Sequence, residues 1–198
     1  MINKRDLIEI AENDGLVKYS EKLLSKYNLP NETREILQEM GVPKYAAPYI
    51  SFIEEESGGG NRLSNYYDLS VYENSEYIEQ EELDKIKVYF QSYIVLGNSE
   101  NDVFVLNEKF RVIRVDHETL DEYYINYTLN DFLESLSAYK KSVDKVLNRY
   151  NELVFFDDKI TEDDIKTLKY ELLKIDKNSF AKESFWSSEI ERLEENIK

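Results

Sequence analysis

YIVLGNSENDVFVLNEKFRVIRVD, residues 93–116, contains three short runs that favour β-strands, separated by two breaks. The runs 93–96, 103–106 and 112–115 are rich in β-branched and aromatic residues, which fit a pleated, half-buried surface. The breaks carry Gly, Asn, Asp and Ser, so the pattern predicts an antiparallel meander. Because every side chain of 103–106 is apolar, we expect that strand to lie centrally, and helices must supply at least one of its covers.

Periodic apolar residues predict helices before this stretch. They recur in residues 4–27 around a polar break at 13–15, which indicates two helices. A shorter helix is expected to begin after Pro30 and to end at Gly41. Residues 46–53 then resemble a loop that enters an extended segment.

The composition changes between residues 54 and 84. This segment has three consecutive glycines, several tyrosines and a single basic residue, which predicts a long loop or a pair of weak edge strands. The alternation of Ile86, Val88 and Phe90 then predicts a strand that leads into the meander.

A long helix is predicted after the meander, over residues 128–148. Thr128 is its expected N-cap, and Asp131 stands at the position that reaches back to the cap. We expect Phe132, Leu136 and Val143 to be buried where this helix packs on the sheet.

The C-terminal part is predicted to add two more helices. Thr161 with Asp164 has the spacing that starts one helix, and Ser188 with Glu191 has the same spacing for the last. Phe185-Trp186 would precede that final helix and anchor it.

Length and composition predict a folded protein. A chain of 198 residues fits one domain, and 13% aromatic residues argue against disorder despite 33% charged residues. There is no Cys, which excludes disulfides, thiolate metal sites and a cysteine nucleophile and fits a cytoplasmic location. Neither an export signal nor a membrane-spanning run is visible, so we expect a cytoplasmic protein that is monomeric when free.

The net charge of −16 is concentrated in one segment. Residues 54–84 hold 10 acidic and 1 basic residue and therefore carry more than half of the excess. Such a field repels phosphate backbones, so direct nucleic-acid binding is not expected, whereas a basic protein partner would be attracted. The alternative is an ordinary soluble surface without a specific partner.

Catalytic motifs are largely missing. His117 is the single histidine, which excludes a multi-histidine metal site, and in its charged turn we expect it to be solvated. The glycines at 58–60 lack the Lys-Ser/Thr ending of a P-loop, so a flexible loop is expected there. The acids at 157–164 lack calcium-loop spacing and are explained as the start of a helix. We therefore expect neither enzymatic activity nor a bound cofactor or metal.

Tyrosines and glutamates between 66 and 82 form the candidate partner-binding site. Aromatic rings supply anchors in protein interfaces, and acids steer a basic partner toward them. An edge-strand face without a partner is the alternative interpretation. The candidate residues are Tyr66, Tyr67, Tyr72, Glu73, Glu76, Tyr77, Glu79, Glu81 and Glu82.

An ordered series of short motifs resembles the SUKH superfamily of bacterial immunity proteins, in particular its fourth group. The motifs are Leu29-Pro30 with a helix that ends in Gly41-Val42-Pro43, Tyr93-Ile94-Val95-Leu96-Gly97, the strands 103–106 and 112–115 with Asp116, and Ile125-Asn126-Tyr127-Thr128-Leu129 running into Phe132 and Leu136. The tail, with Ile175-Asp176 and Phe185-Trp186 through Leu193, is similar to extensions of that group. Order and spacing carry the resemblance, because each motif is short. The turn at 126–128 departs from the usual Asn-Ser-Ser form, and 54–84 matches no motif of the family.

The resemblance implies an α+β fold with a central, mainly antiparallel sheet flanked by helices. It divides a single SUKH-like domain, 1–198, into a core of about 16–150 and a helical C-terminal extension, 151–198. It also implies an immunity protein that binds and neutralises a cognate polymorphic toxin, here expected to be a basic nuclease, by direct protein contact. A toxin gene is then expected immediately upstream.

Two other classes of function remain open. One is an interaction or regulatory module of the same fold without a toxin partner. The other is an enzyme that uses a pair of carboxylates, for which 41 acidic residues give no specific signature.

Overall fold

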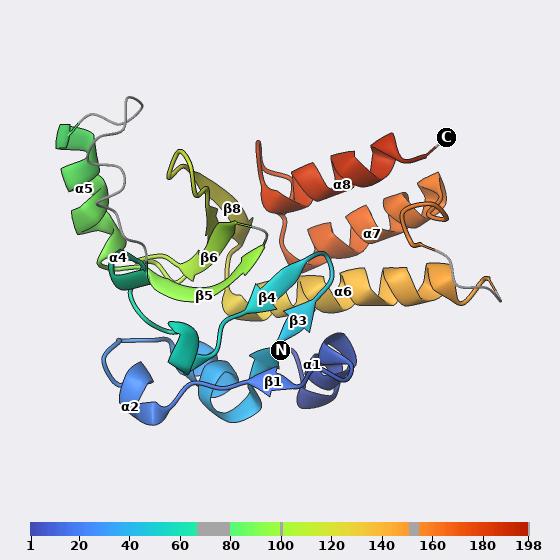
Figure 1. Ribbon diagram of the computed structural model, residues 1–198. Coiled ribbons are helices and arrows are strands. Elements are labelled where there is room, and N and C mark those ends of the chain that lie inside the picture. The colour runs from blue at the N-terminus through green and yellow to red at the C-terminus, as the bar shows by residue number, and fades with distance from the viewer. Residues whose placement is uncertain (67–79, 100, 151–154, 198) are drawn as a thin grey trace.

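The computed structural model describes residues 1–66, 80–99, 101–150 and 155–197 and shows an α+β fold (Figure 1). The N-terminal elements are α1 (Lys4–Ala11), β1 (Leu16–Val17), α2 (Glu21–Leu24), α3 (Asn31–Glu35), the π-helical η1 (Ile36–Met40), β2 (Val42–Pro43), β3 (Tyr45–Ala46), β4 (Ile50–Phe52), the 3-10 helix η2 (Glu55–Ser57) and α4 (Leu63–Tyr66). They are followed by α5 (Gln80–Phe90), β5 (Ile94–Ser99), β6 (Asp102–Leu106), β7 (Val112–Val115), β8 (Glu122–Asn126), α6 (Leu129–Leu147), α7 (Glu162–Ile175) and α8 (Phe185–Glu195).

The predicted meander is confirmed and forms part of a larger sheet. Strands β5, β6 and β7 pair in succession, and the sheet has the order β3-β4-β5-β6-β7-β8 with every neighbouring pair antiparallel. A separate two-stranded ribbon joins β1 to β2. The short β3–β4 hairpin lies at one edge of the sheet, beside α6 in Figure 1.

Both faces of the central strand β6 are covered, as its unbroken apolar sequence predicts. Phe104 and Leu106 belong to the cluster that includes α6 and α8, and the ring centroid of Phe104 lies 5.9 Å from that of Phe132. Val103 and Val105 belong to a second cluster on the opposite face, which α4 and α5 cover. The sheet therefore separates two hydrophobic cores.

Helix α6 begins and packs as the sequence predicts. The Thr128 hydroxyl accepts a hydrogen bond from the backbone N–H of Asp131 at 3.0 Å. Phe132 and Leu136 are fully buried against the sheet, whereas Val143 is only half-buried near the far end of the helix.

A buried hydrogen-bond network ties the C-terminal helices to the sheet. Asn126, at the end of β8, accepts a hydrogen bond from the indole N–H of Trp186 at 2.9 Å and donates one to the hydroxyl of Ser135 at 3.2 Å. Asp176, which follows α7, accepts hydrogen bonds from the Tyr124 hydroxyl at 2.5 Å and from the Tyr127 backbone at 2.9 Å. The turn at 126–128 therefore connects β8, α6 and the C-terminal extension.

The prediction of a strand at 84–90 is wrong, because these residues belong to helix α5. Leu83 and Phe90 are buried and Ile86 is half-buried, and their spacing of three and four residues places them on one helical face. Val88, the middle member of the apparent alternation, points to solvent with 69% of its surface exposed. Three residues were too few to separate the two periods.

Two helix boundaries also differ from the sequence prediction. After α1, residues 16–17 form a strand, so the second N-terminal helix is reduced to α2. The last helix is capped by Ser184 rather than Ser188: the Ser184 hydroxyl accepts a hydrogen bond from the Ser187 backbone at 3.2 Å. This earlier start places Phe185 and Trp186 in the first turn, where both are buried.

The segment expected to be a loop or edge strands is partly helical where it is described, with turns between the helices. It contains η2, α4 and the start of α5. The glycines at 58–60 do not form an open loop, since the Gly60 N–H donates to Val95 at 2.8 Å. A Cβ on Gly59 would lie 1.9 Å from the Ile53 carbonyl oxygen, so this position has no room for a side chain. The glycines allow close backbone packing beside the sheet.

Candidate functional site

The structure describes only part of the tyrosine- and glutamate-rich candidate site. Tyr66 ends α4 and packs, half-buried, against the cluster on the α5 face of the sheet. Glu81 is exposed on α5 and forms an ion pair with Lys85 at 2.8 Å. The other candidates lie outside the described residues, namely Tyr67, Tyr72, Glu73, Glu76, Tyr77, Glu79 and the side chain of Glu82. The structure therefore brings none of these candidates together into a described site.

His117 has a partner that its sequence neighbours did not reveal. Its Nδ1 lies 2.9 Å from Asp102, which comes from β6 and also contacts the Nε of Arg114 at 3.3 Å. Hydrogen bonding to Asp102 raises the pKa of His117. Oxygen and nitrogen atoms of Asp102, Asp116 and His117 lie within 4.8 Å of one another, which is the spacing of a possible cation site.

Existing interactions already use these ligand atoms. The Asp116 carboxylate accepts hydrogen bonds from the backbones of Glu118 and Thr119, both at 2.8 Å, and thereby closes its own turn. The nearby guanidinium of Arg114 adds positive charge. We therefore interpret the cluster as a structural turn that hydrogen bonds hold against β6.

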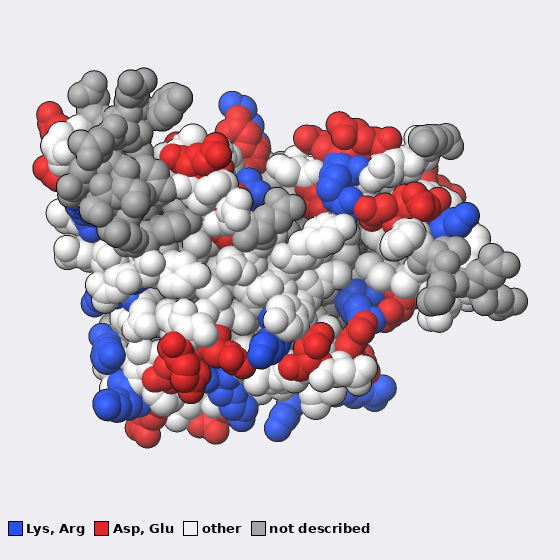
Figure 2. Space-filling model, in the orientation of Figure 1, with Lys and Arg blue, Asp and Glu red and all other residues white. Residues whose placement is uncertain are grey.

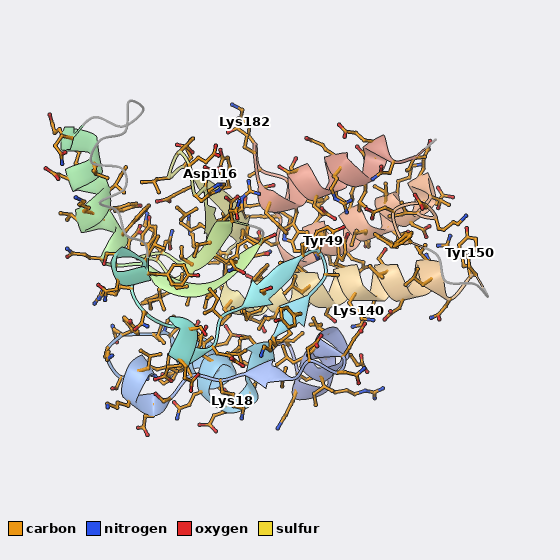
Figure 3. The ribbon with its side chains drawn as sticks, viewed as in Figure 1. Lys18, Tyr49, Asp116, Lys140, Tyr150 and Lys182 are labelled. Carbon is orange, nitrogen blue, oxygen red and sulfur yellow. The ribbon has the colours of Figure 1, made fainter. Side chains whose placement is uncertain are left out.

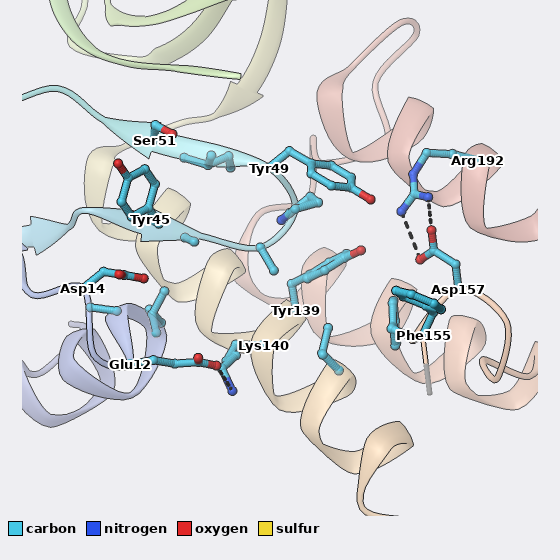
Figure 4. A pocket seen from close by; sticks show the side chains of 18 residues that line it. Glu12, Asp14, Tyr45, Tyr49, Ser51, Tyr139, Lys140, Phe155, Asp157 and Arg192 are labelled. Carbon is cyan, nitrogen blue, oxygen red and sulfur yellow. Dashed lines mark hydrogen bonds and ion pairs between the residues drawn. The ribbon is translucent and has the colours of Figure 1, made fainter. Parts of the chain in front are cut away.

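A second candidate site is a groove beside the β3–β4 edge of the sheet. It has a volume of about 660 Å³ and lies between the end of α1, the β3–β4 hairpin, α6, the segment 155–157 and α8 (Figure 4). Figure 3 places Tyr49 at the hairpin tip and Lys140 on α6 below it, with Asp116 well away from both. We call this feature the hairpin groove.

Exposed aromatic rings border the hairpin groove. The exposed fractions of Tyr45, Tyr49 and Phe155 are 48%, 68% and 80%. Tyr49 has a φ of +52°, a backbone conformation that only a few per cent of non-glycine residues adopt. Figure 4 shows its ring directed toward Arg192, whose guanidinium carbon lies 5.8 Å from the ring centroid.

Two cations line the hairpin groove among the described residues, and each is bound by two carboxylates. Arg192 donates to Glu189 at 2.8 Å and forms an ion pair with Asp157, and the hydrogen bonds to these two carboxylates raise the pKa of its guanidinium. Glu189 also accepts a hydrogen bond at 2.5 Å from the hydroxyl of Tyr139, which forms part of the groove floor.

Lys140 is neutralised in the same way. Its ammonium forms ion pairs with Asp144 and, at 3.0 Å, with Glu12. Burial alone would lower the pKa of Lys140, but the hydrogen bonds to these carboxylates outweigh burial and raise it. Glu12 keeps 61% of its side chain exposed, and Asp14 is also exposed at the same rim. The groove can therefore offer aromatic surface and carboxylate oxygens to a partner.

The hairpin groove could not be predicted from the sequence, because its residues come from distant segments. Tyr45 and Tyr49 lie on either side of a proline turn, whereas Phe155 and Arg192 lie more than 100 residues later. A local signal was present in the two tyrosines of the YAAPY stretch, residues 45–49, which place exposed rings around a turn.

The surface around the groove has separate charged and uncharged regions. Figure 2 shows acidic side chains clustered above a mainly uncharged band that crosses the centre of the visible face. The β3–β4 hairpin lies along this band in the same orientation (Figure 1). Within the described residues, no helix is both long and apolar enough to cross a membrane.

Comparison with known proteins places the chain in a family. A family model with the description SUKH-4 immunity protein matches residues 2–192. No curated protein and no solved structure matches the chain. The match covers the six-stranded sheet, nearly all of both hydrophobic cores and most of residues 151–198.

Proposed function

The chain belongs to the SUKH-4 immunity protein family, and from this we propose that it binds a cognate toxin and neutralises it by direct protein contact. The family match over residues 2–192 is the observation that carries the proposal. The chain would act as an inhibitor and not as an enzyme, without a cofactor. Its surface supports this function, because the hairpin groove joins exposed aromatic rings, which can anchor a protein partner, to carboxylates, which can steer a basic one.

Charge indicates the kind of toxin. A nuclease that binds the phosphate backbone needs a basic cleft. A chain with a net charge of −16 provides the complementary electrostatic field. We therefore propose a basic nuclease as the partner, with no direct binding of the chain to nucleic acid or to membranes.

Residues 54–84 are proposed to contribute to the interface. This segment has 10 acidic residues and 1 basic residue, which would attract a basic toxin before contact. Of its candidate residues, Glu81 is exposed on α5, where Val88 and Tyr89 add exposed apolar surface. Rim charges mainly set the association rate, whereas buried tyrosines would slow dissociation.

We propose that the whole chain, 1–198, acts as one cytoplasmic domain that is monomeric when free. One hydrophobic cluster supports the single folded unit, because it extends from Ile2 along one face of the sheet to Leu193 in α8. The C-terminal extension would then be part of the folded unit and not a separate module.

Co-expression tests the proposal. The toxin domain encoded immediately upstream should stop growth when expressed alone and should be tolerated when this chain is expressed with it. Purified chain and toxin should also form a complex in size-exclusion chromatography. Continued growth arrest together with separate elution of the two proteins would overturn the proposal.

A variant with less charge tests the contribution of 54–84. Changing Glu73, Glu76, Glu79, Glu81 and Glu82 together to Gln should slow association with the toxin and flatten its dependence on salt. Stopped-flow kinetics over a range of ionic strength would measure both effects. Unchanged rates and an unchanged salt slope would remove this segment from the interface.

A further inference from the structure

We infer that the hairpin groove receives an arginine or lysine side chain, flanked by apolar residues, from the toxin that the chain is proposed to bind. This inference rests on the proposed function and adds to it the surface and the chemistry of recognition. Three observations carry it: the exposed rings, the balance of charge, and a guanidinium already held in the groove.

The two exposed tyrosines stand on a backbone that the fold holds in place. Tyr45 and Tyr49 belong to a hairpin that pairs with β5, and Phe52 of the same hairpin packs on Phe132 with ring centroids 6.0 Å apart. Tyr49 also keeps an unusual positive φ while most of its side chain faces water. Such a conformation persists only where the surrounding structure maintains it. The groove thus presents apolar rings to solvent on a preorganised support.

The charges of the groove favour a cation as the occupant. Arg192 and Lys140 are each engaged by two carboxylates, so neither offers an uncompensated positive charge. Glu12 and Asp14 remain exposed at the rim. A phosphate or an acidic peptide would meet repulsion here, whereas a basic side chain would meet carboxylate oxygens.

The groove already shows how it holds a guanidinium. Arg192 lies over the ring of Tyr49 while Asp157 and Glu189 bind its nitrogen atoms. This combination of an aromatic face with carboxylates is the chemistry that recognises cationic side chains. Tyr49 remains 68% exposed despite this contact, so its ring retains surface for a second cation.

Charge also decides between a toxin and a second copy of this chain. Two copies would each bring a net charge of −16 and would repel one another, most strongly at low ionic strength. A basic partner avoids this repulsion, and its side chains can cover the aromatic rings of the groove. The flanking apolar residues of that partner would cover Tyr45 and Phe155.

Two blocked peptides test the chemistry without the toxin. The ¹⁵N-labelled full chain is titrated with Leu-Arg-Leu-Arg-Leu and, separately, with Leu-Glu-Leu-Glu-Leu. We expect salt-sensitive shifts of the amides of Tyr45, Tyr49 and Ser51 with the arginine peptide alone. Tyr49→Ala should weaken that binding about fivefold. Tyr170→Ala is the matched control, because Tyr170 is 64% exposed on α7 and does not line the groove.

The peptide result has clear contrary outcomes. Equal shifts with both peptides, shifts confined to other surfaces, or no shifts at millimolar peptide would each overturn the inference. A concentration-dependent dimer of the free chain that Tyr49→Ala abolishes would overturn it in favour of a second copy.

Toxin inhibition separates this inference from the proposed function. The variant with Tyr45, Tyr49 and Phe155 all changed to Ala should bind the upstream-encoded toxin domain at least about 30-fold more weakly than wild type. The control variant Tyr170→Ala/Leu173→Ala should bind as wild type does. If wild type inhibits and the groove variant inhibits equally well, the groove inference alone fails. If the wild-type chain leaves the toxin active, the proposed function is wrong, and the toxin is then also excluded as the partner that fills the groove.

Discussion

Replacement of Asn126 by Leu should reveal how strongly the C-terminal extension is fastened to the sheet. Asn126 is fully buried, and its carbonyl oxygen accepts the hydrogen bond of the Trp186 indole, which is also fully buried. Leucine has a similar shape but no polar atoms, so the indole N–H and the Ser135 hydroxyl would each lose a partner. An unsatisfied buried polar group costs about 1–3 kcal/mol, so we expect a loss of about 2–4 kcal/mol in the free energy of unfolding.

A double-mutant cycle isolates the bond between the two side chains. Trp186→Phe leaves the Asn126 oxygen without its donor and should cost a comparable amount. In the double variant neither partner of that bond remains, so its loss should fall short of the sum of the single losses by about 1–2 kcal/mol. Urea unfolding followed by circular dichroism would measure all four free energies. The exposed Asn28→Leu is the control and should change stability by less than about 0.5 kcal/mol.

Additive losses would refute the reasoning. If the free-energy changes of Asn126→Leu and Trp186→Phe simply sum, the two side chains do not share a buried hydrogen bond. A loss below about 0.5 kcal/mol for Asn126→Leu alone would show that the 126–128 turn does not hold the extension.

Three further predictions follow from individual contacts. Phe132→Ala should cost about 3–5 kcal/mol in urea unfolding, because the ring is fully buried between the sheet and α6, and a loss under about 1 kcal/mol would contradict that placement. Burial would raise the pKa of Asp164, but hydrogen bonds from Arg149 and Thr161 prevail and lower it to about 2. Its folded pKa is thus below the unfolded value near 4, so about 2 kcal/mol of stability should be present above that pH and lost as the pH falls toward 2. Asp164→Asn should flatten this part of the stability profile, and a profile equal to wild type would contradict the assignment. Removal of divalent ions with a chelator should leave the melting temperature unchanged, because Arg114 already lies beside Asp102 in the candidate cation cluster; a lower value restored by calcium would contradict this.

Local sequence signals were sufficient for the meander and for the long helix. Each strand of the meander combined β-favouring residues with turn residues at its ends, so sequence and tertiary structure agree there. Thr128 and Thr161 cap α6 and α7, because N-cap hydrogen bonds depend on residues only three positions apart.

Local sequence patterns gave wrong predictions where packing between distant segments determines the secondary structure. The helical face of α5 is defined by the cluster that it covers, whereas the local alternation of Ile86, Val88 and Phe90 indicated a strand. Ser184 and Ser188 could each start a helix, and burial of Phe185 and Trp186 accompanies the earlier start at Ser184. Local patterns do not contain this information.

Site prediction was limited by the same cause. The tyrosine- and glutamate-rich segment could be proposed from composition alone, because charge and aromatic content are local properties. The hairpin groove could not, since Tyr49, Lys140 and Arg192 meet only after the sheet edge, α6 and α8 have assembled. Asp102 likewise becomes the partner of His117 only through the antiparallel pairing of β6 and β7.

The most direct test of the central claim is a titration of toxin activity against this chain. Fixed amounts of the upstream-encoded toxin domain are mixed with increasing chain, and residual activity and the mass of the toxin are measured at each ratio. Inhibition by binding predicts that activity falls linearly to an end point at a fixed molar ratio and that toxin released by denaturation and refolding has unchanged mass and full activity. Complete inactivation by a small fraction of one equivalent, a changed toxin mass, or undiminished activity at excess chain would contradict neutralisation by direct contact.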